Sequence, residues 1–527
     1  MIDFIRKHTL IFGTLFLTAT GFLSRILGFF YRIFLSRTIG AEGLGIYQMI
    51  FPIYNIGFSL CAGSIQTAIS RFAAADQTQA KKTLRTGFLI SFSMSLLLAA
   101  LIWSQADFIA VHILMEPRCA PLLPAMALAI PCTSIHACIS GYYYGKEKVQ
   151  VPAMSQLVEQ CIRIFCVFLI ADICKEQGRE ITVMIAVVGL VIGEAASALF
   201  TLLCFLLAQP RTEQVEDTVE GDGGRSGQEI PHPGQTCARQ TFLSTAIPLM
   251  SLALPLMANR LIMNLLQSAE AILIPNRLSV YGLTQSQAVS IYGVLTGMAM
   301  PFIMFPSAIV NSMAVVLLPS VARHQSAGSH TDITNSISIS FRYSLYMGIL
   351  CIGIFTVFGD SLGLAVFQNE DAGSFITILA WLCPFLYLAT TMGSILNGMG
   401  KTTSTFLHNL IAMLVRLGFV FFGIPHVGIK AVLWGMLGGE ILLSLLHLAS
   451  LERLVPYMPD VWDVIVKPVC CLVAAFGIYR LLPQSLPIAS AVPPFIETAL
   501  RIGFVCMGYG LMLLLLAPRT KRKSSVV

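Results

Sequence analysis

Charged residues are scarce in this chain, and their scarcity excludes a soluble protein. Only 11% of the 527 residues are Asp, Glu, Lys or Arg, whereas 56% are hydrophobic and the mean hydropathy is +0.78. Soluble domains carry about 25% charged residues, because a folded domain must cover its water-facing surface. The net charge of +6 is also small, so a nucleic-acid partner is not expected. The composition predicts a polytopic membrane protein.

Catalytic and metal-binding motifs are also missing. The nine His show no H-E-x-x-H or other ligand spacing, and the fourteen Cys are scattered through apolar segments, where Cys is usually a small buried hydrophobe. The letters GKT at 400–402 resemble the end of a phosphate-binding loop, but Ile395 stands where that motif has its first glycine. We therefore expect neither an enzyme nor a bound metal or cofactor, apart from a coupling ion.

Long apolar runs dominate the chain. A helix crosses a bilayer with about 20 mostly apolar residues, because each backbone polar group must be satisfied within the segment. Fourteen such runs lie near residues 10–35, 47–72, 84–106, 122–143, 154–173, 181–207, 243–274, 289–318, 337–358, 375–396, 406–424, 431–451, 461–482 and 495–516. They predict an all-α protein with fourteen transmembrane helices.

The positive charges predict how these helices are oriented. Lys and Arg gather in short cytoplasmic loops. If both chain ends are cytoplasmic, 20 of the 33 Lys and Arg fall in inner segments and eight in outer loops. The sequence therefore predicts a multi-pass protein of the plasma membrane with both termini inside the cell.

The chain contains an internal duplication. A shift of 253 residues pairs Pro131 with Pro384, Lys148 with Lys401 and Arg163 with Arg416, and a shift of 246 pairs Glu194 with Glu440. We expect an N-lobe at 1–208, a disordered cytoplasmic linker at 209–240, a C-lobe at 241–456, two extra helices at 457–517 and a basic tail at 518–527. Six helices per lobe give both lobes the same orientation, with substrate bound between them near the midplane.

Three intramembrane arginines are candidates for substrate binding. Arg25 and Arg32 lie seven residues apart on one face of the first helix, and Arg260 opens the second lobe as Arg25 opens the first. An arginine at a helix centre costs about 2.5–3.5 kcal/mol on insertion scales, so it normally faces a wet cavity or a partner. Guanidinium groups bind phosphate oxygens in a fork, which predicts a phosphate or diphosphate ligand. Arg32 alternatively snorkels to the outer interface.

The other intramembrane charges predict structural pairs or ion coupling. Arg163 and Arg416 occupy matching places and are expected to tie to Glu194 and Glu440 rather than to contact ligand. Glu270 either binds a proton or cation, or pairs with Arg260. Coupling through Na⁺ or H⁺ therefore competes with coupling through the membrane potential, which supplies about 2.3 kcal/mol per charge per 100 mV.

Prolines interrupt helices at comparable places in the two lobes. Pro52 lies in the second helix, Pro255 in the seventh, and Pro301 and Pro306 in the eighth. Broken backbone ladders of this kind provide the bending that a rocking transporter needs. We expect these prolines to act in gating.

Several motifs resemble one superfamily of membrane exporters. SRILGF at 24–29 resembles the opening of MurJ-type lipid II flippases, whereas YQMIFPIY at 47–54, YGVLTGMAMP at 292–301 and FPS at 305–307 are similar to the stage V sporulation protein B branch of polysaccharide exporters. Both belong to the multidrug/oligosaccharidyl-lipid/polysaccharide (MOP) exporter superfamily. The segment FSLCAG at 58–63 lacks the arginine of MurJ-type proteins, and SIQ at 64–66 replaces the usual Gly-Ile-Pro of the sporulation branch. These differences favour a sporulation or polysaccharide paralogue.

The resemblance implies a bacterial flippase that opens alternately to each membrane face and moves an undecaprenyl-pyrophosphate-linked saccharide outward. By motif match, Arg25 holds the pyrophosphate; Arg260 is assigned by position, and Arg32 stands one residue beyond the expected second arginine. The last two helices resemble a pair that forms a groove for the lipid tail. Expected partners are the anionic lipid-linked saccharide, the bilayer and cell-wall synthesis enzymes, with the flippase itself monomeric.

Two other functions stay open at this point. A cation-coupled multidrug exporter has the same architecture but selects cationic substrates, which the arginines of helix one would repel. A membrane scaffold for envelope assembly would use the arginines only for packing between helices.

Overall fold

All regular secondary structure is helical in the residues that the computed structural model of the protein describes, which are 2–208, 242–455, 460–481 and 494–516. The first half contains α1 (Ile2–Phe58), α2 (Ser64–Ala75), α3 (Ala80–Ser104), α4 (Ala106–Phe108), α5 (Leu122–Ala127), α6 (Ala129–Gly145), α7 (Gln150–Glu176) and α8 (Met184–Leu207). The second half contains α9 (Phe242–Tyr281), α10 (Gln285–Gly293), α11 (Met300–Met304), α12 (Ser307–Ser326), α13 (His330–Leu362), α14 (Glu370–Leu379), α15 (Cys383–Gly398), α16 (Thr402–Gly418), α17 (Ile424–Val427), α18 (Ile429–Leu454), α19 (Lys467–Leu481) and α20 (Pro494–Leu515).

Short tighter or wider turns extend several of these helices. Wide π-helical turns lie at Ser59–Gly63, Ile109–Ile113, Val294–Ala299, Gly363–Phe367, Phe419–Gly423 and Trp462–Val466, and 3₁₀ turns at Pro117–Cys119 and Ala380–Leu382.

The all-α membrane fold predicted from the apolar runs is confirmed. Twelve helical spans in the described residues are long and apolar enough to cross a membrane. The first of them, residues 16–75, covers most of the predicted range 10–35 and all of 47–72, and α7 lies over a further predicted range. The number of crossings, fourteen, stays a prediction.

Gly40 separates the first two predicted helices within α1. Its φ of 71° and ψ of −179° interrupt the helical backbone, and a residue with a Cβ rarely adopts this conformation. Pro52 lies farther along α1, just before the π-helical turn Ser59–Gly63. Glycine at position 40 therefore lets the chain change direction between these two predicted helices.

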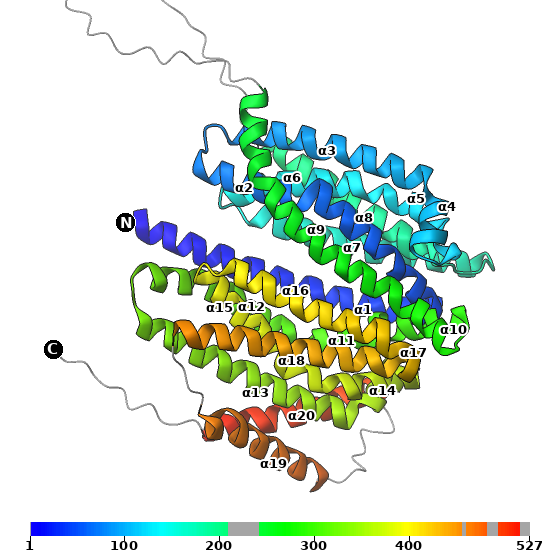
Figure 1. Cartoon of the computed structure of the whole chain (residues 1–527), viewed down its shortest axis with the longest axis vertical. Helices are drawn as coiled ribbons and strands as arrows, with labels where there is room; N and C mark the ends of the chain where they lie inside the picture. The colour runs from blue at the N-terminus through cyan, green and yellow to red at the C-terminus, as the bar shows by residue number, and fades with distance from the viewer. Residues whose placement is uncertain (1, 209–241, 456–459, 482–493, 517–527) are drawn as a thin grey trace, which may run out of the picture.

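Two groups of helices repeat the same packing (Figure 1). In the first group α8 packs against α6 and α7, and in the second α18 packs against α15 and α16. The turns between the matched helices also correspond, since Glu147 and Gly400, 253 residues apart, both have positive φ. These contacts fit the duplication seen in the sequence, and α19 and α20 pack together on the outer side of α13.

The first helix of each lobe packs against the other lobe. Phe29 of α1 contacts Phe302 and Phe305 at ring-centroid distances of 4.8 and 5.3 Å. In return, Leu249 and Ala253 of α9 are buried in a core cluster whose other members come from α2, α3 and α6. The domain limits stay predictions, and the predicted linker at 209–240 and tail at 518–527 lie outside the described residues.

Candidate functional site

A cavity of about 450 Å³ lies between the lobes beside Arg25 and Arg32. Both side chains come from α1 and line it together, as their spacing of seven residues on one helix face requires. The opposite wall belongs to α11 and α12. Arg32 also lies 3.5 Å from the backbone oxygen of Thr296 through its Nη1. The structure therefore places two of the three candidate arginines in one interlobe space.

Amide side chains line the same cavity, and the sequence reasoning missed them. Gln156 and Gln160 come from α7, and Asn311 comes from α12. The Gln160 Oε1 is buried without a hydrogen-bond partner among the described residues. A smaller cavity of about 230 Å³ shares Arg25, Gln156 and Asn311 with the first. Their positions within apolar helices could have indicated a functional role, because polar side chains inside membrane segments are usually functional.

Arg260 lies apart from this cavity. Its guanidinium rests against α2, with Nη2 3.2 Å from the Oγ1 of Thr67. A Cβ on Gly63 would approach its Nη1 to 2.3 Å, so the glycine leaves room for the arginine. Arg260 is exposed in this conformation, and its role in substrate binding stays a prediction.

The predicted prolines lie in three different settings. Pro255 is inside the continuous α9, together with Pro248 and Pro275. Pro306 stands at the break between α11 and α12. Pro301, at the start of α11, lines the cavity of Arg25. The break between α11 and α12 therefore borders the candidate binding space. The gating role of the prolines stays a prediction.

A second large cavity, of about 480 Å³, lies beside the two extra helices. It is lined by α12, α13, α20 and the start of α19, mostly with apolar side chains such as Met313, Leu350 and Leu513. Arg342 and Lys467 supply its positive groups, and both pair with Asp463. Its apolar walls suit an acyl or prenyl chain, as the resemblance of these helices implied.

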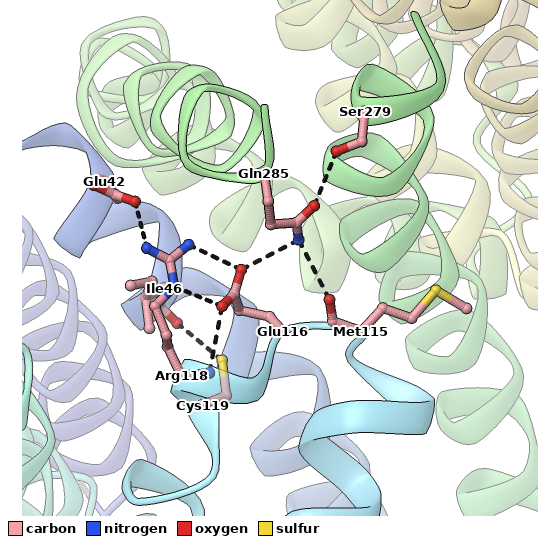
Figure 2. Close-up of polar contacts among 8 residues, drawn as sticks. All are labelled: Glu42, Ile46, Met115, Glu116, Arg118, Cys119, Ser279 and Gln285. Atoms are coloured by element: carbon pink, nitrogen blue, oxygen red, sulfur yellow. Dashed lines mark hydrogen bonds and ion pairs between the residues drawn. The ribbon is translucent and has the colours of Figure 1, made fainter. Parts of the chain in front are cut away.

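A polar network, here called the latch, joins the lobes at the end of the bundle where α10 lies (Figure 2). Arg118 binds both Glu42 and Glu116, with its Nε 2.6 Å from the Glu116 Oε1. Gln285 of the second lobe donates to the Glu116 Oε2 at 3.2 Å and to the backbone oxygen of Met115 at 3.3 Å. The latch therefore holds the connection before α5 against the start of α10.

Close backbone packing lies next to the latch. A Cβ on Gly45 would come within 2.1 Å of the Val289 oxygen, and a Cβ on Gly293 within 2.0 Å of the Ala41 oxygen. Small residues of this kind allow membrane helices to approach at backbone distance. The Arg37 Nε also donates to the Val366 oxygen across the lobes at 2.8 Å. The protein is thus closed at the latch end.

The structure corrects the expected partners of the buried charges. Arg416 pairs with Glu270, with its Nη2 2.8 Å from Oε1 and 2.9 Å from Oε2, and not with Glu440. Glu270 therefore does not pair with Arg260. Glu440 has a buried Oε2 without a hydrogen-bond partner among the described residues. We name Glu270, Arg416 and Glu440 the C-lobe triad.

The first lobe has a matching group. Arg163 binds Glu159, four residues earlier on α7, and its Nη2 lies 3.9 Å from the Glu194 Oε1. The expected partner Glu194 is therefore near, but Glu159 is nearer. The sequence reasoning missed Glu159, although its spacing of four residues from Arg163 was a readable signal. We name Glu159, Arg163 and Glu194 the N-lobe triad.

We expect neutralisation of Glu116 to loosen the latch. Burial alone would raise the pKa of Glu116, but hydrogen bonds from Arg118 and Gln285 and the charge of Arg118 lower it below the usual range. Such a carboxyl stabilises the latched state above its ordinary pKa of about 4.3 and loses this effect as the pH falls through its lowered pKa. Glu116→Gln at pH 7 should therefore open the latch about fivefold more often, a loss of about 1 kcal/mol for a part-exposed pair.

The thiol of Cys119 reports on this opening, since Cys119 is fully buried beside the latch. Its reaction with a dithiodipyridine reagent, which stays reactive in acid, should accelerate in Glu116→Gln at neutral pH and in the unmodified protein at low pH. The exposed Glu180 provides the control variant, Glu180→Gln. Equal rates in Glu116→Gln and the control would show that the latch does not hold this end closed.

The sequence of the first lobe and part of the second matches a family model. The model describes polysaccharide biosynthesis proteins and matches residues 10–325, more than half of the chain. The chain belongs to this family. It is 28% identical over 460 residues to stage V sporulation protein B of Bacillus subtilis, covering 85% of each chain. It is 22% identical over 433 residues to the lipid II flippase MurJ of the same organism, covering 77% of this chain and 75% of the flippase.

Solved structures of MOP transporters share the fold of this family member. It matches the lipid II flippase MurJ in an inward closed conformation with a TM-score of 0.69 and 12% identity, over 95% of this chain and 98% of that chain. It matches an inward-facing multidrug resistance transporter of the MOP superfamily with a TM-score of 0.61 and 12% identity, over 82% and 94% of the two chains. The predicted superfamily is confirmed, and these relatives are flippases and transporters rather than enzymes.

Proposed function

We propose that the protein is an alternating-access flippase for a lipid-linked saccharide that carries a phosphate or diphosphate. The supporting observation is the cavity between the lobes, which Arg25 and Arg32 line together with Gln156, Gln160 and Asn311. Guanidinium groups bind phosphate oxygens bidentately, and amides bind sugar hydroxyls through both their donors and their acceptors. Among the described residues that line this cavity there is no carboxylate, so the lining disfavours the cationic substrates of a multidrug exporter.

The path of the lipid follows from the two cavities. The headgroup occupies the interlobe space, while the prenyl chain lies in the apolar cavity between α12, α13 and α20. The latch end faces the outside of the cell, in agreement with the distribution of Lys and Arg, and the present conformation is closed on that side. Opening of the latch would release the headgroup to the outer leaflet of a bacterial plasma membrane.

Lipid binding by the purified protein tests this proposal. Native mass spectrometry with undecaprenyl diphosphate and, as the uncharged match, undecaprenol should show a preference for the diphosphate. Arg25→Ala should weaken diphosphate binding about ten- to hundredfold, the effect of one charged hydrogen bond worth about 1.5–3 kcal/mol. Arg453→Ala, at the exposed end of α18, is the control. Equal binding of both lipids, or unchanged binding in Arg25→Ala, would contradict the proposal, and both results would also fit a scaffold.

A further inference from the structure

The two triads each hold one carboxylate more than they hold guanidinium groups. In the N-lobe triad, Arg163 binds Glu159 and leaves Glu194 at 3.9 Å. In the C-lobe triad, Arg416 binds Glu270 and leaves Glu440. The leftover glutamates are the pair that the duplication aligns. An unpaired ionised carboxylate inside a membrane protein is costly, and such a group normally takes up a proton instead.

The two hydroxyls that contact Glu194 have more oxygen contacts between them than protons to give. Tyr54 Oη lies 2.8 Å from the Glu194 Oε1 and 2.9 Å from the Thr133 Oγ1. Thr133 Oγ1 in turn lies 3.0 Å from the Glu194 Oε2 and 2.9 Å from the Ala129 oxygen. Each of these four contacts needs a proton to be a hydrogen bond, and the two hydroxyls supply two. A proton on Glu194 supplies a third.

Glu440 lacks any such neighbour for its Oε2, which is buried without a hydrogen-bond partner in the described part of the chain. A protonated carboxyl avoids the burial of an uncompensated negative charge there. Glycine precedes both glutamates and makes room for the arginine of its triad. A Cβ on Gly193 would lie 3.2 Å from the Arg163 Nε, and one on Gly439 would lie 2.7 Å from the Arg416 Cγ.

Other titratable groups surround the two glutamates. Those that face the N-lobe triad are Tyr31, Arg32, Tyr47 and Tyr54 from α1, and Cys132 and His136 from α6. Tyr292 of α10 faces the C-lobe triad. Tyr31 is 5% exposed, and its Oη is buried without a partner. A Cβ on Gly189 would lie 3.6 Å from this Oη and 3.6 Å from the backbone oxygen of Arg163. The Tyr31 hydroxyl therefore lies beside the N-lobe triad.

We propose that Glu194 and Glu440 are two equivalent proton sites, one in each lobe, and that each carries one proton per transport cycle. The N-lobe site adjoins the substrate cavity, because Gln156, Gln160 and Arg163 share one face of α7. Movement of α7 during opening changes the distance between Arg163 and Glu194, and a closer guanidinium releases the proton to water. This coupling rests on the proposed flippase function, whereas the protonation of the two glutamates does not.

Infrared spectroscopy tests the protonation directly. The purified protein in lipid nanodiscs at pH 7 should show two carbonyl bands of protonated carboxyls that shift in D₂O. Glu194→Gln and Glu440→Gln should each lose one band, and the double variant both, while the exposed control Glu452→Gln keeps both. Glu194→Asp and Glu440→Asp, which keep the titratable group, cover the case in which a glutamine variant does not fold. Absence of the bands in the unmodified protein, or their replacement by sodium-dependent binding, would overturn the proposal.

Transport in proteoliposomes tests the coupling. With two protons per cycle, a gradient of one pH unit should change the ratio of a labelled undecaprenyl diphosphate between leaflets about a hundredfold, and with one proton about tenfold. We therefore expect about a hundredfold for the unmodified protein, tenfold for each single glutamine variant and no effect for the double variant. A probe that moves without any response to the gradient would overturn the coupling. A probe that does not move at all would contradict the flippase function, and the infrared bands would still decide the proton sites.

Discussion

Replacing Gly293 by alanine is expected to force the latch end open and stop transport. The added Cβ would lie 2.0 Å from the Ala41 oxygen and 2.6 Å from the Gly45 nitrogen. Both are backbone atoms that cannot rotate away, so the two helices must separate. Overpacking of this kind costs about 1–3 kcal/mol, which reduces the closed fraction relative to the open one by about five- to hundredfold.

Labelling of Cys119 measures this opening, because Cys119 is fully buried next to the latch in the closed state. Its rate of modification should rise by the same factor in Gly293→Ala, while movement of the lipid probe falls. Gly418→Ala is the matched control, since a Cβ at Gly418 meets nothing within 4 Å. If Gly293→Ala keeps the labelling rate and activity of the control, the close packing at this end does not restrain the lobes.

Replacing Arg416 by methionine is expected to destabilise the second lobe by about 3 kcal/mol. The variant leaves Glu270, whose side chain is 9% exposed, without its partner, and breaking a buried ion pair costs about 3–5 kcal/mol. The free energy of unfolding in mixed micelles measures the change. In the double variant Arg416→Met/Glu270→Gln no unpaired charge is left at this pair, so most of the loss should be recovered.

Arg501 supplies the comparison for that measurement. It pairs with Glu497 four residues earlier, and the two side chains are 36% and 31% exposed. Arg501→Met should therefore cost less than about 1 kcal/mol. A similar cost for Arg416→Met and Arg501→Met would show that the Arg416–Glu270 pair does not stabilise the protein.

The fold was predictable because apolar runs of bilayer length permit few structures other than helices. The duplication was also readable, since proline, glycine and charged residues inside membrane helices are rare enough for a repeated pattern to be recognised. Arg25 and Arg32 were predictable as neighbours in one cavity from their spacing of seven residues alone, because both lie on one helix.

Contacts between distant helices were harder to predict. Arg416 of α16 pairs with Glu270 of α9 and not with Glu440 of α18. This pairing depends on the packing of the three helices and not on a local spacing in the sequence. Arg260 was assigned to substrate binding by its position, which matches that of Arg25, and the packing of α9 against the first lobe brings it next to Gly63 and Thr67. The latch joins Glu116 with Gln285, residues 169 positions apart, and no periodic pattern in the sequence marks it.

The packing of α9 against the first lobe also affects how the protein folds during synthesis. The ribosome delivers α2, α3 and α6 well before it delivers Leu249 and Ala253, which complete their shared core. The nascent first half therefore waits in the membrane with one face uncovered until the chain beyond residue 242 inserts. Two halves divided at residue 208 and coexpressed would have to associate through this same face. Association of the halves would then complete the core of the first lobe.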